Sequence, residues 1–128
     1  DKLGMSADEI ATVCSAIGNH DESTAFPVNA VAAALILADK TDVRRTRVRN
    51  RDKASFDIHD RVNYAVEKAA TTLNAQEKAV VLTLTLDTEM SAVMDYFEIF
   101  LDRMLLCRKA AEKLGLSFRL VVNGQAVM

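Results

Sequence analysis

The feature that most constrains the fold is the alternation of large and smaller side chains in AVVLTLTLD, residues 79–87. Leu82, Leu84 and Leu86 alternate with valine and threonine along this stretch. Because successive side chains of a strand point to opposite faces of a sheet, the pattern predicts a strand with one buried face. A strand of this kind leaves unpaired backbone groups along both edges, so the chain must contain partner strands.

Further strands are predicted before and after this one in the sequence. Residues 64–73, YAVEKAATTL, fit a helix as well as a strand, but Tyr64, Val66 and the paired threonines favour a strand. NAQE, residues 74–77, suits a hairpin loop. A helix is predicted over 91–114, with Gly115 at its end, and a last strand over 117–122, followed by an Asn-Gly turn. The second half of the chain therefore reads as a β-β-α-β unit.

Two helices are predicted in the first half of the chain. Ser6 and Glu9 form a capping box at the start of a helix over 6–20. Its apolar residues recur at helical spacing: Ile10, Val13, Cys14 and Ile17. A second helix begins near Pro27. A short connection joins the two helices, so they are predicted to pack antiparallel.

The second helix, VNAVAAALILAD, is apolar almost all round, which is typical of a buried helix. Its heaviest stripe is formed by Val28, Val31, Ala32 and Leu35. Asp39 falls on the same stripe and is therefore predicted to be buried. A buried carboxylate needs a partner, so Asp39 either holds a metal ion or simply caps a helix or pairs with an arginine. The antiparallel packing would leave His20 about 15–18 Å from Asp39.

Basic residues follow Asp39 closely: Arg44, Arg45, Arg47, Arg49 and Arg51 lie within one short segment. Arginines there can bind a phosphate group, or they can form a solvated basic face; both interpretations stay open. A literal His-Asp pair occurs further on, at His59 and Asp60. We interpret this pair as the start of a short helix or as a hydrogen-bonded turn.

Composition limits the classes of function. The chain has 128 residues, 16 basic and 18 acidic side chains and a formal net charge of −2, which does not suggest a general nucleic-acid binder. Phe118 is the single aromatic residue on the clear strands, so the predicted sheet offers no stacking platform for RNA. No apolar stretch of ~18 residues predicts a membrane span. Cys14 and Cys107 read as buried free thiols in a reducing, cytoplasmic compartment.

The segment IGNHDE…FPVNAVAAALILADKTDVRRTRVR resembles the closing part of an HD-domain protein, of the metal-dependent phosphohydrolase superfamily. The resemblance covers roughly residues 6–50. It implies a helical bundle around a divalent metal ion, such as Mn, Fe or Mg, that hydrolyses a phosphate ester. Asp39 matches the family's late aspartate, and His20 matches an additional histidine that some members use. The family's early histidine and central His-Asp pair would lie before residue 1.

The expected fold class is α+β, with the remnant of an HD-type helical bundle in residues 1–56 and a small β-β-α-β domain in residues 57–128. The resemblance implies that the chain is the C-terminal portion of a phosphohydrolase acting on a phosphorylated small molecule, and that it is inactive alone. Asp39 and His20 would bind the metal, and Lys40, Arg44 and Arg45 the phosphate. The alternative is a non-catalytic binding or dimerisation module with a vestigial metal site. In either case, the missing N-terminal half or a homodimer mate is expected to cover the apolar face of residues 28–35.

Overall fold

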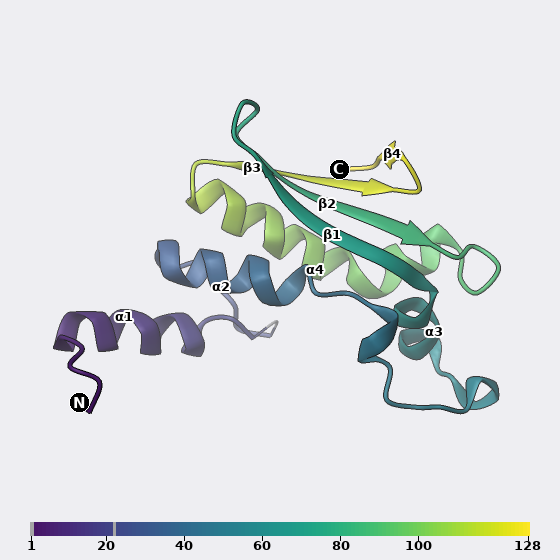
Figure 1. Ribbon diagram of the computed structural model, residues 1–128, viewed down its shortest axis with the longest axis horizontal. Helices are drawn as coiled ribbons and strands as arrows, with labels where there is room; N and C mark the ends of the chain where they lie inside the picture. Colours follow the sequence, from purple (N-terminus) through teal and green to yellow (C-terminus); the bar gives the residue numbers. More distant parts are fainter. Residues whose placement is uncertain (1, 22) are drawn as a thin grey trace.

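The protein has an α+β fold in which helices cover one face of a four-stranded mixed sheet (Figure 1). The structure is a computed structural model that describes residues 2–21 and 23–128. The helices are α1 (Ala7–Gly18), α2 (Ala30–Lys40), α3 (Ile58–Ala65) and α4 (Val93–Lys113). The strands are β1 (Val66–Asn74), β2 (Ala79–Leu86), β3 (Ser117–Val122) and β4 (Gln125–Ala126). None of the described helices is both long and apolar enough to cross a membrane.

The strands lie in the order β1-β2-β3-β4. β1 and β2 form an antiparallel hairpin, whereas β2 and β3 are parallel and are joined through α4. β4 turns back antiparallel to β3 through Asn123 and Gly124, both of which have positive φ, as a two-residue hairpin loop requires. The predicted strands over 79–87 and 117–122, the helix between them and the Asn-Gly turn are therefore confirmed.

The ambiguous stretch at residues 64–73 contains both of the structures that its sequence allowed. Helix α3 ends at Ala65, and β1 starts at the next residue. A bulge between Val66 and Lys68 then adjusts the register of β1 against β2. The strand prediction is thus confirmed from Val66 onward, and a helical turn precedes it.

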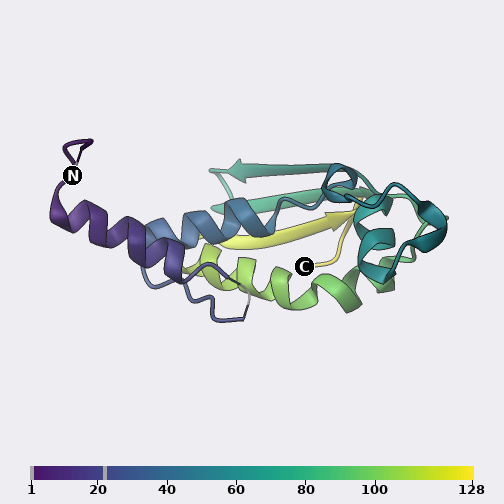
Figure 2. The same cartoon turned by 90° about the horizontal axis from the view of Figure 1, so that it is seen from below.

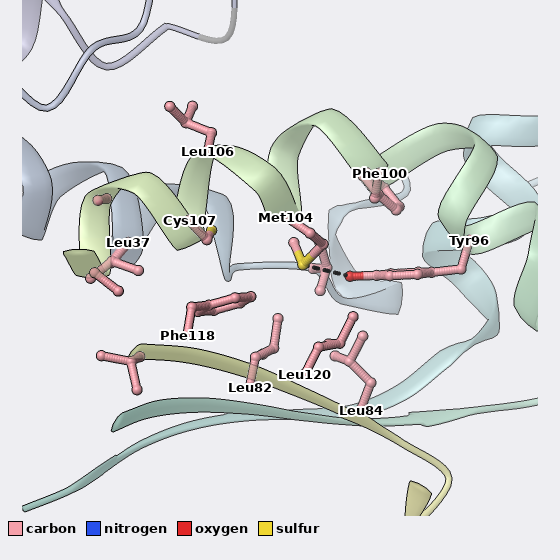
Figure 3. Packing of buried hydrophobic residues seen from close by; sticks show 14 of the residues in the cluster. Leu37, Leu82, Leu84, Tyr96, Phe100, Met104, Leu106, Cys107, Phe118 and Leu120 are labelled. Atoms are coloured by element: carbon pink, nitrogen blue, oxygen red, sulfur yellow. Dashed lines mark hydrogen bonds between the residues drawn. The ribbon is translucent and has the colours of Figure 1, made fainter. Parts of the chain in front are cut away.

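The core lies between α4 and the inner face of the sheet (Figure 3). Leu82, Leu84 and Leu120 point from the strands towards α4 and are fully buried. From α4, the Tyr96 hydroxyl donates to Sδ of Met104 at 3.4 Å, so the one polar atom of this buried ring has a partner. The threonines of β2 alternate to the other face of the sheet, which is exposed.

Helix α1 begins as its sequence predicts. The Ser6 hydroxyl accepts from the backbone N–H of Glu9 at 3.2 Å, and the Glu9 carboxylate accepts from Ser6 N at 3.0 Å. Helix α2 begins later than Pro27, at Ala30, because the Asn29 side chain accepts from Ala32 N at 2.8 Å and caps the helix there.

The helices α1 and α2 run in the same direction in both views (Figures 1 and 2), so the predicted antiparallel packing is wrong. The connection, residues 19–29, is long enough to carry the chain back along α1 before α2 begins. As a result, the C-terminal ends of both helices lie towards the same side of the molecule.

Helix α2 packs on α4 through a face that is rotated from the predicted one. Ala32 of the predicted stripe is fully buried, together with Ala33 and Ile36, whereas Val28 and Val31 of that stripe are exposed. The small alanines let α2 and α4 approach closely. Because α2 is apolar all round, its sequence does not indicate which face packs on α4. The buried residues of α2 belong to the same core as the sheet. The division of the chain into domains 1–56 and 57–128 stays a prediction.

Candidate functional site

The residues predicted to bind metal and phosphate lie around the C-terminal end of α2. Asp39 and Lys40 form the last turn of that helix, and Arg44 and Arg45 belong to the irregular segment that follows it. His20 lies just after the end of α1. The parallel course of α1 and α2 brings these segments to one side of the molecule.

Asp39 was predicted to face the core, but it does not. Its side chain is 37% exposed, whereas the side chain of Lys40 is only 7% exposed. The reason is the rotated packing face of α2: Lys40 follows Ile36 by four residues and therefore lies on the buried side. The Lys40 Nζ donates to Asp39 Oδ2 at 2.6 Å, so the buried ammonium is neutralised by the neighbouring carboxylate.

The electrostatic surroundings of Asp39 are basic. Burial raises the pKa of this carboxyl, but the hydrogen bond from Lys40 and the charges of Lys40, His20 and Arg47 outweigh that effect and lower the pKa below its ordinary value of 3.8. The charge of His20 is one of those that act on Asp39. The predicted separation by a whole helix length rested on antiparallel packing of the two helices, and it loses that basis.

His20 is oriented by its own helix. Its Nδ1 lies in short contact with the carbonyl oxygen of Ile17. A carbonyl can only accept, so Nδ1 carries a proton and donates, and Nε2 is the nitrogen that bears the lone pair in the neutral ring. Metal-binding histidines in proteins are commonly held in this way, with one ring nitrogen donating to a backbone carbonyl.

The described residues do not complete a metal site. No group of three or more His, Cys, Asp or Glu side chains suitable for a metal ion occurs within residues 2–21 and 23–128. His20 and Asp39 offer two donor groups, and Lys40 already occupies one oxygen of Asp39. A catalytic zinc-type site uses three protein ligands, so the implied metal ion does not fit these residues alone.

Two of the arginines share one carboxylate that the sequence gave no reason to single out. Asp42 Oδ1 accepts from Arg44 Nε at 2.7 Å, and Asp42 Oδ2 accepts from Arg47 Nη1 at 3.1 Å. The guanidinium of Arg47 also reaches the backbone carbonyl of Asp42 at 3.4 Å. These contacts fold the segment after α2 onto itself and partly neutralise the two cations.

Arg45 has a different partner. Its Nε donates to the carbonyl oxygen of Tyr64 at 2.9 Å, and its guanidinium carbon lies 4.4 Å from the centroid of the Tyr64 ring. Lys53 also lies over this ring, at 4.6 Å, and the Phe56 ring is 5.4 Å away. A hydrogen bond from Lys53 lowers the pKa of Tyr64; desolvation opposes this effect, and the charges of Lys53 and Arg45 lower the pKa further. The contacts of Arg45 tie the basic segment to α3.

The three residues predicted to bind phosphate therefore have three different partners. Lys40 pairs with Asp39, Arg44 with Asp42, and Arg45 with Tyr64. One of them, Arg44, lines a cavity of about 270 Å³ between the end of α2 and β1. The wall of this cavity is formed by Ala38, Thr41, Asp42, Arg44, Ala69 and Thr71. One acid and one base line this cavity, so their charges offset one another.

The His-Asp pair at residues 59 and 60 is a helix start, as interpreted from the sequence. Both residues lie in the first turn of α3. The side chain of Asp57 caps that turn by accepting from Asp60 N at 2.7 Å. The Asn63 amide donates to the carbonyl oxygen of His59 at 3.0 Å, within the same helix.

The apolar stripe that the sequence indicates on α1 lies at the surface. Ile10, Val13 and Ile17 are 37%, 39% and 56% exposed, and Cys14 between them is exposed as well. These four residues are called the α1 stripe below. Helix α1 instead buries Ala16, whose small side chain permits close packing. Both cysteines are free thiols; Cys107 is buried as predicted, whereas the prediction for Cys14 is wrong.

We compared the chain with protein-family models, with curated proteins and with solved structures, and found no match. The resemblance to the HD family therefore stays a prediction. Function has to be inferred from the contacts, burial and charges of the residues themselves.

Proposed function

We propose that the chain is a protein–protein interaction module, and that its working surface is the α1 stripe. The observation that carries this proposal is the orientation of α1, which buries Ala16 and turns its branched side chains outward. Exposed apolar residues scattered singly are normal, but four at helical spacing on one face form a contiguous strip. Such a strip is typical of a helix that another protein surface covers.

The alternative explanation for the α1 stripe is that it contributes to the stability of the chain itself. Fully burying a branched aliphatic side chain contributes about 1.5–3 kcal/mol to stability. If Ile10, Val13 and Ile17 did this within the chain, replacing all three would cost about 5–9 kcal/mol, comparable to the total stability of a small domain. As an interaction surface, they would contribute little to the stability of the isolated chain.

The test is a variant with three substitutions, Ile10→Ser, Val13→Ser and Ile17→Ser, studied by urea unfolding at low protein concentration. We expect its free energy of unfolding to fall by no more than about 1–2 kcal/mol, the range of exposed helix substitutions. Binding of a fluorescent dye specific for exposed apolar surface should also fall. The control replaces three exposed apolar residues elsewhere: Leu73→Ser, Met94→Ser and Leu101→Ser. A loss of the free energy of unfolding as large as that of a core deletion would refute the proposal.

A second candidate function is supported by a separate observation. The charge of His20 lowers the pKa of Asp39, and because Nδ1 contacts the carbonyl oxygen of Ile17, Nε2 is the ring nitrogen that would bind a metal ion. This arrangement supports the metal-dependent phosphohydrolase predicted from the sequence, with the remaining metal ligands supplied by another part of a longer protein or by a partner. The chain alone would then be inactive on phosphate esters.

This second candidate is tested by titrating the chain with Mn²⁺ and following the paramagnetic signal of free metal. We expect weak binding that is reduced at least about tenfold in Asp39→Ala and in His20→Ala, since each removes one ligand. Asp60→Ala, on α3, is the control and should bind as the unmodified chain does. Binding of Mn²⁺ that is identical in all of these proteins would exclude His20 and Asp39 as ligands.

A further inference from the structure

We infer that the partner of the α1 stripe is a second copy of this chain, with the two α1 helices packed antiparallel about a two-fold axis near Val13 and Cys14. This inference rests on the proposed interaction function and adds the identity and geometry of the partner. Three properties of the chain support it: its total exposed area, the symmetry of the α1 stripe and the distribution of charge along α1.

The chain exposes more surface than a compact monomer of its size. Its accessible surface is 7989 Å² for a mass of 14.1 kDa. The scaling for folded monomers gives about 6,700 Å² at this mass. The excess is about 1,300 Å², and a stable dimer of standard size buries about 800 Å² on each partner. This excess belongs to the whole chain, and it is larger than the area that one partner contributes to such an interface.

The α1 stripe is complementary to itself. Ile10 and Ile17 lie seven residues apart, which places them about 10 Å apart along the helix axis. Val13 and Cys14 lie on either side of the midpoint. In an antiparallel pair, Ile10 of one copy faces Ile17 of the other, and Val13 of one copy faces Cys14 of the other. Every apolar group on one helix then meets an apolar group on its partner, which is the pattern of an isologous interface.

The charges of α1 select the antiparallel arrangement over the parallel one. Asp8 and Glu9 lie in the first turn of the helix, and the last turn carries no basic residue. A parallel pair would gather four carboxylates at one end and align the two helix dipoles. An antiparallel pair separates the two acidic ends by about 15 Å, beyond the Debye length of about 8 Å at physiological ionic strength, and opposes the dipoles.

The position of α1 in the fold leaves room for a partner. In both views α1 lies at the margin of the molecule, against α2, and its N-terminal end extends beyond the sheet (Figures 1 and 2). Packed helices have axes about 8–10 Å apart, so the side chains of a second α1 can reach the stripe. The α1 helices of two copies can therefore meet without displacing any part of the core.

Cys14 allows the geometry to be tested directly. It is exposed, whereas the other thiol, Cys107, is buried. We expect light scattering to show a mass rising towards twice 14.1 kDa between about 1 and 100 µM, where interfaces of this size associate. A short bismaleimide should then join two copies through Cys14. Cross-linking should disappear in Cys14→Ser. The double variant Cys14→Ser, Glu98→Cys moves the thiol to the exposed surface of α4, and it should cross-link at least about tenfold more slowly than the unmodified chain.

Ile17→Asp should weaken self-association at least about tenfold, because it places an unpaired carboxylate in the interface. Leu101→Asp, which makes the same change at an exposed leucine of α4, should leave association unchanged. A chain that remains monomeric throughout, or a dimer that Ile17→Asp does not weaken, overturns the inference. The proposed interaction function fails on a different measurement, the free energy of unfolding of the triple serine variant, so the two failures are distinguishable.

Discussion

Replacing Asn123 should reveal how the short β3–β4 turn is fixed to the rest of the sheet. Asn123 has a φ of +49°, and its side chain bonds both backbone groups of one residue at the end of β2. The Oδ1 accepts from Leu86 N at 2.8 Å, and the Nδ2 donates to Leu86 O at 3.2 Å. The amide thus takes the place of a neighbouring strand for the last residue of β2.

The size of the effect follows from these contacts. A hydrogen bond contributes about 0.5–1.5 kcal/mol net, so removing two costs about 2 kcal/mol. Asn123→Gly removes the side chain but tolerates the positive φ, and we expect a loss of about 2 kcal/mol. Asn123→Ala keeps a Cβ in the left-handed region without the polar side chain that lets asparagine adopt it, which adds about 1 kcal/mol relative to glycine and brings the loss to about 3 kcal/mol.

Urea unfolding followed by circular dichroism measures both variants, with the same dependence on urea required for a valid comparison. Asn123→Asp keeps the acceptor to Leu86 N and loses the donor to Leu86 O, so it should lie between the unmodified chain and Asn123→Gly. Losses below about 0.5 kcal/mol for all three variants would show that water replaces the side chain at no cost. An alanine variant as stable as the glycine variant would refute the contribution of the backbone conformation.

Two further predictions concern protonation. The two tyrosines should titrate separately in ultraviolet difference spectra. The hydrogen bond from Lys53 lowers the pKa of Tyr64 from 10.0, so Lys53→Met should raise the pKa of Tyr64. Burial raises the pKa of Tyr96 above 10.0. Because the pKa of Tyr96 is raised, the contribution of Tyr96 to stability is fully present below pH 10 and should be lost as the pH increases beyond 10. A single titration shared by both tyrosines would contradict the two opposite pKa shifts. The pKa of Asp39, followed by carbon NMR, should rise in Lys40→Met, and an unchanged pKa in the variant would exclude Lys40 as the cause. Because the pKa of Asp39 is lowered in the folded chain, it contributes stability above pH 3.8 that is lost as the pH falls through the folded pKa.

Local patterns predicted the elements of this fold well. The capping box at Ser6, the alternation at Leu82–Leu86 and the Asn-Gly turn at residue 123 each depend on neighbours in sequence, and each is present in the structure. The packing partners of the helices depend on distant residues and were predicted less well. Nothing local distinguishes the face of α2 that contains Val31 from the face that contains Ile36, because both are apolar.

The candidate site was harder to predict for the same reason. The position of His20 relative to Asp39 depends on the path of residues 19–29, which the sequence suggested only as a short connection. The partners of the arginines also follow from no sequence pattern: Asp42 is one acidic residue within a basic segment, and Tyr64 belongs to a stretch that fits both helix and strand. The α1 stripe was visible in the sequence, but periodicity alone cannot tell whether the chain itself or another molecule covers an apolar face.

The parallel pairing of β2 with β3 sets an order in which the sheet can form. The hairpin of β1 and β2 closes through a loop of residues 75–78, whereas Ala79 can pair with Ser117 only after the chain has passed through all of α4. Local hairpins form in about 1–10 µs, while distant strands must first overcome the entropy of closing a long loop. The hairpin is therefore expected in the folding transition state, and β3 is expected to join late. In the hairpin loop, Lys78→Gly relieves a residue with a φ of +50° and should accelerate refolding. Destabilising changes at the β2–β3 contact should mainly accelerate unfolding. The opposite pattern in stopped-flow kinetics would reverse this order.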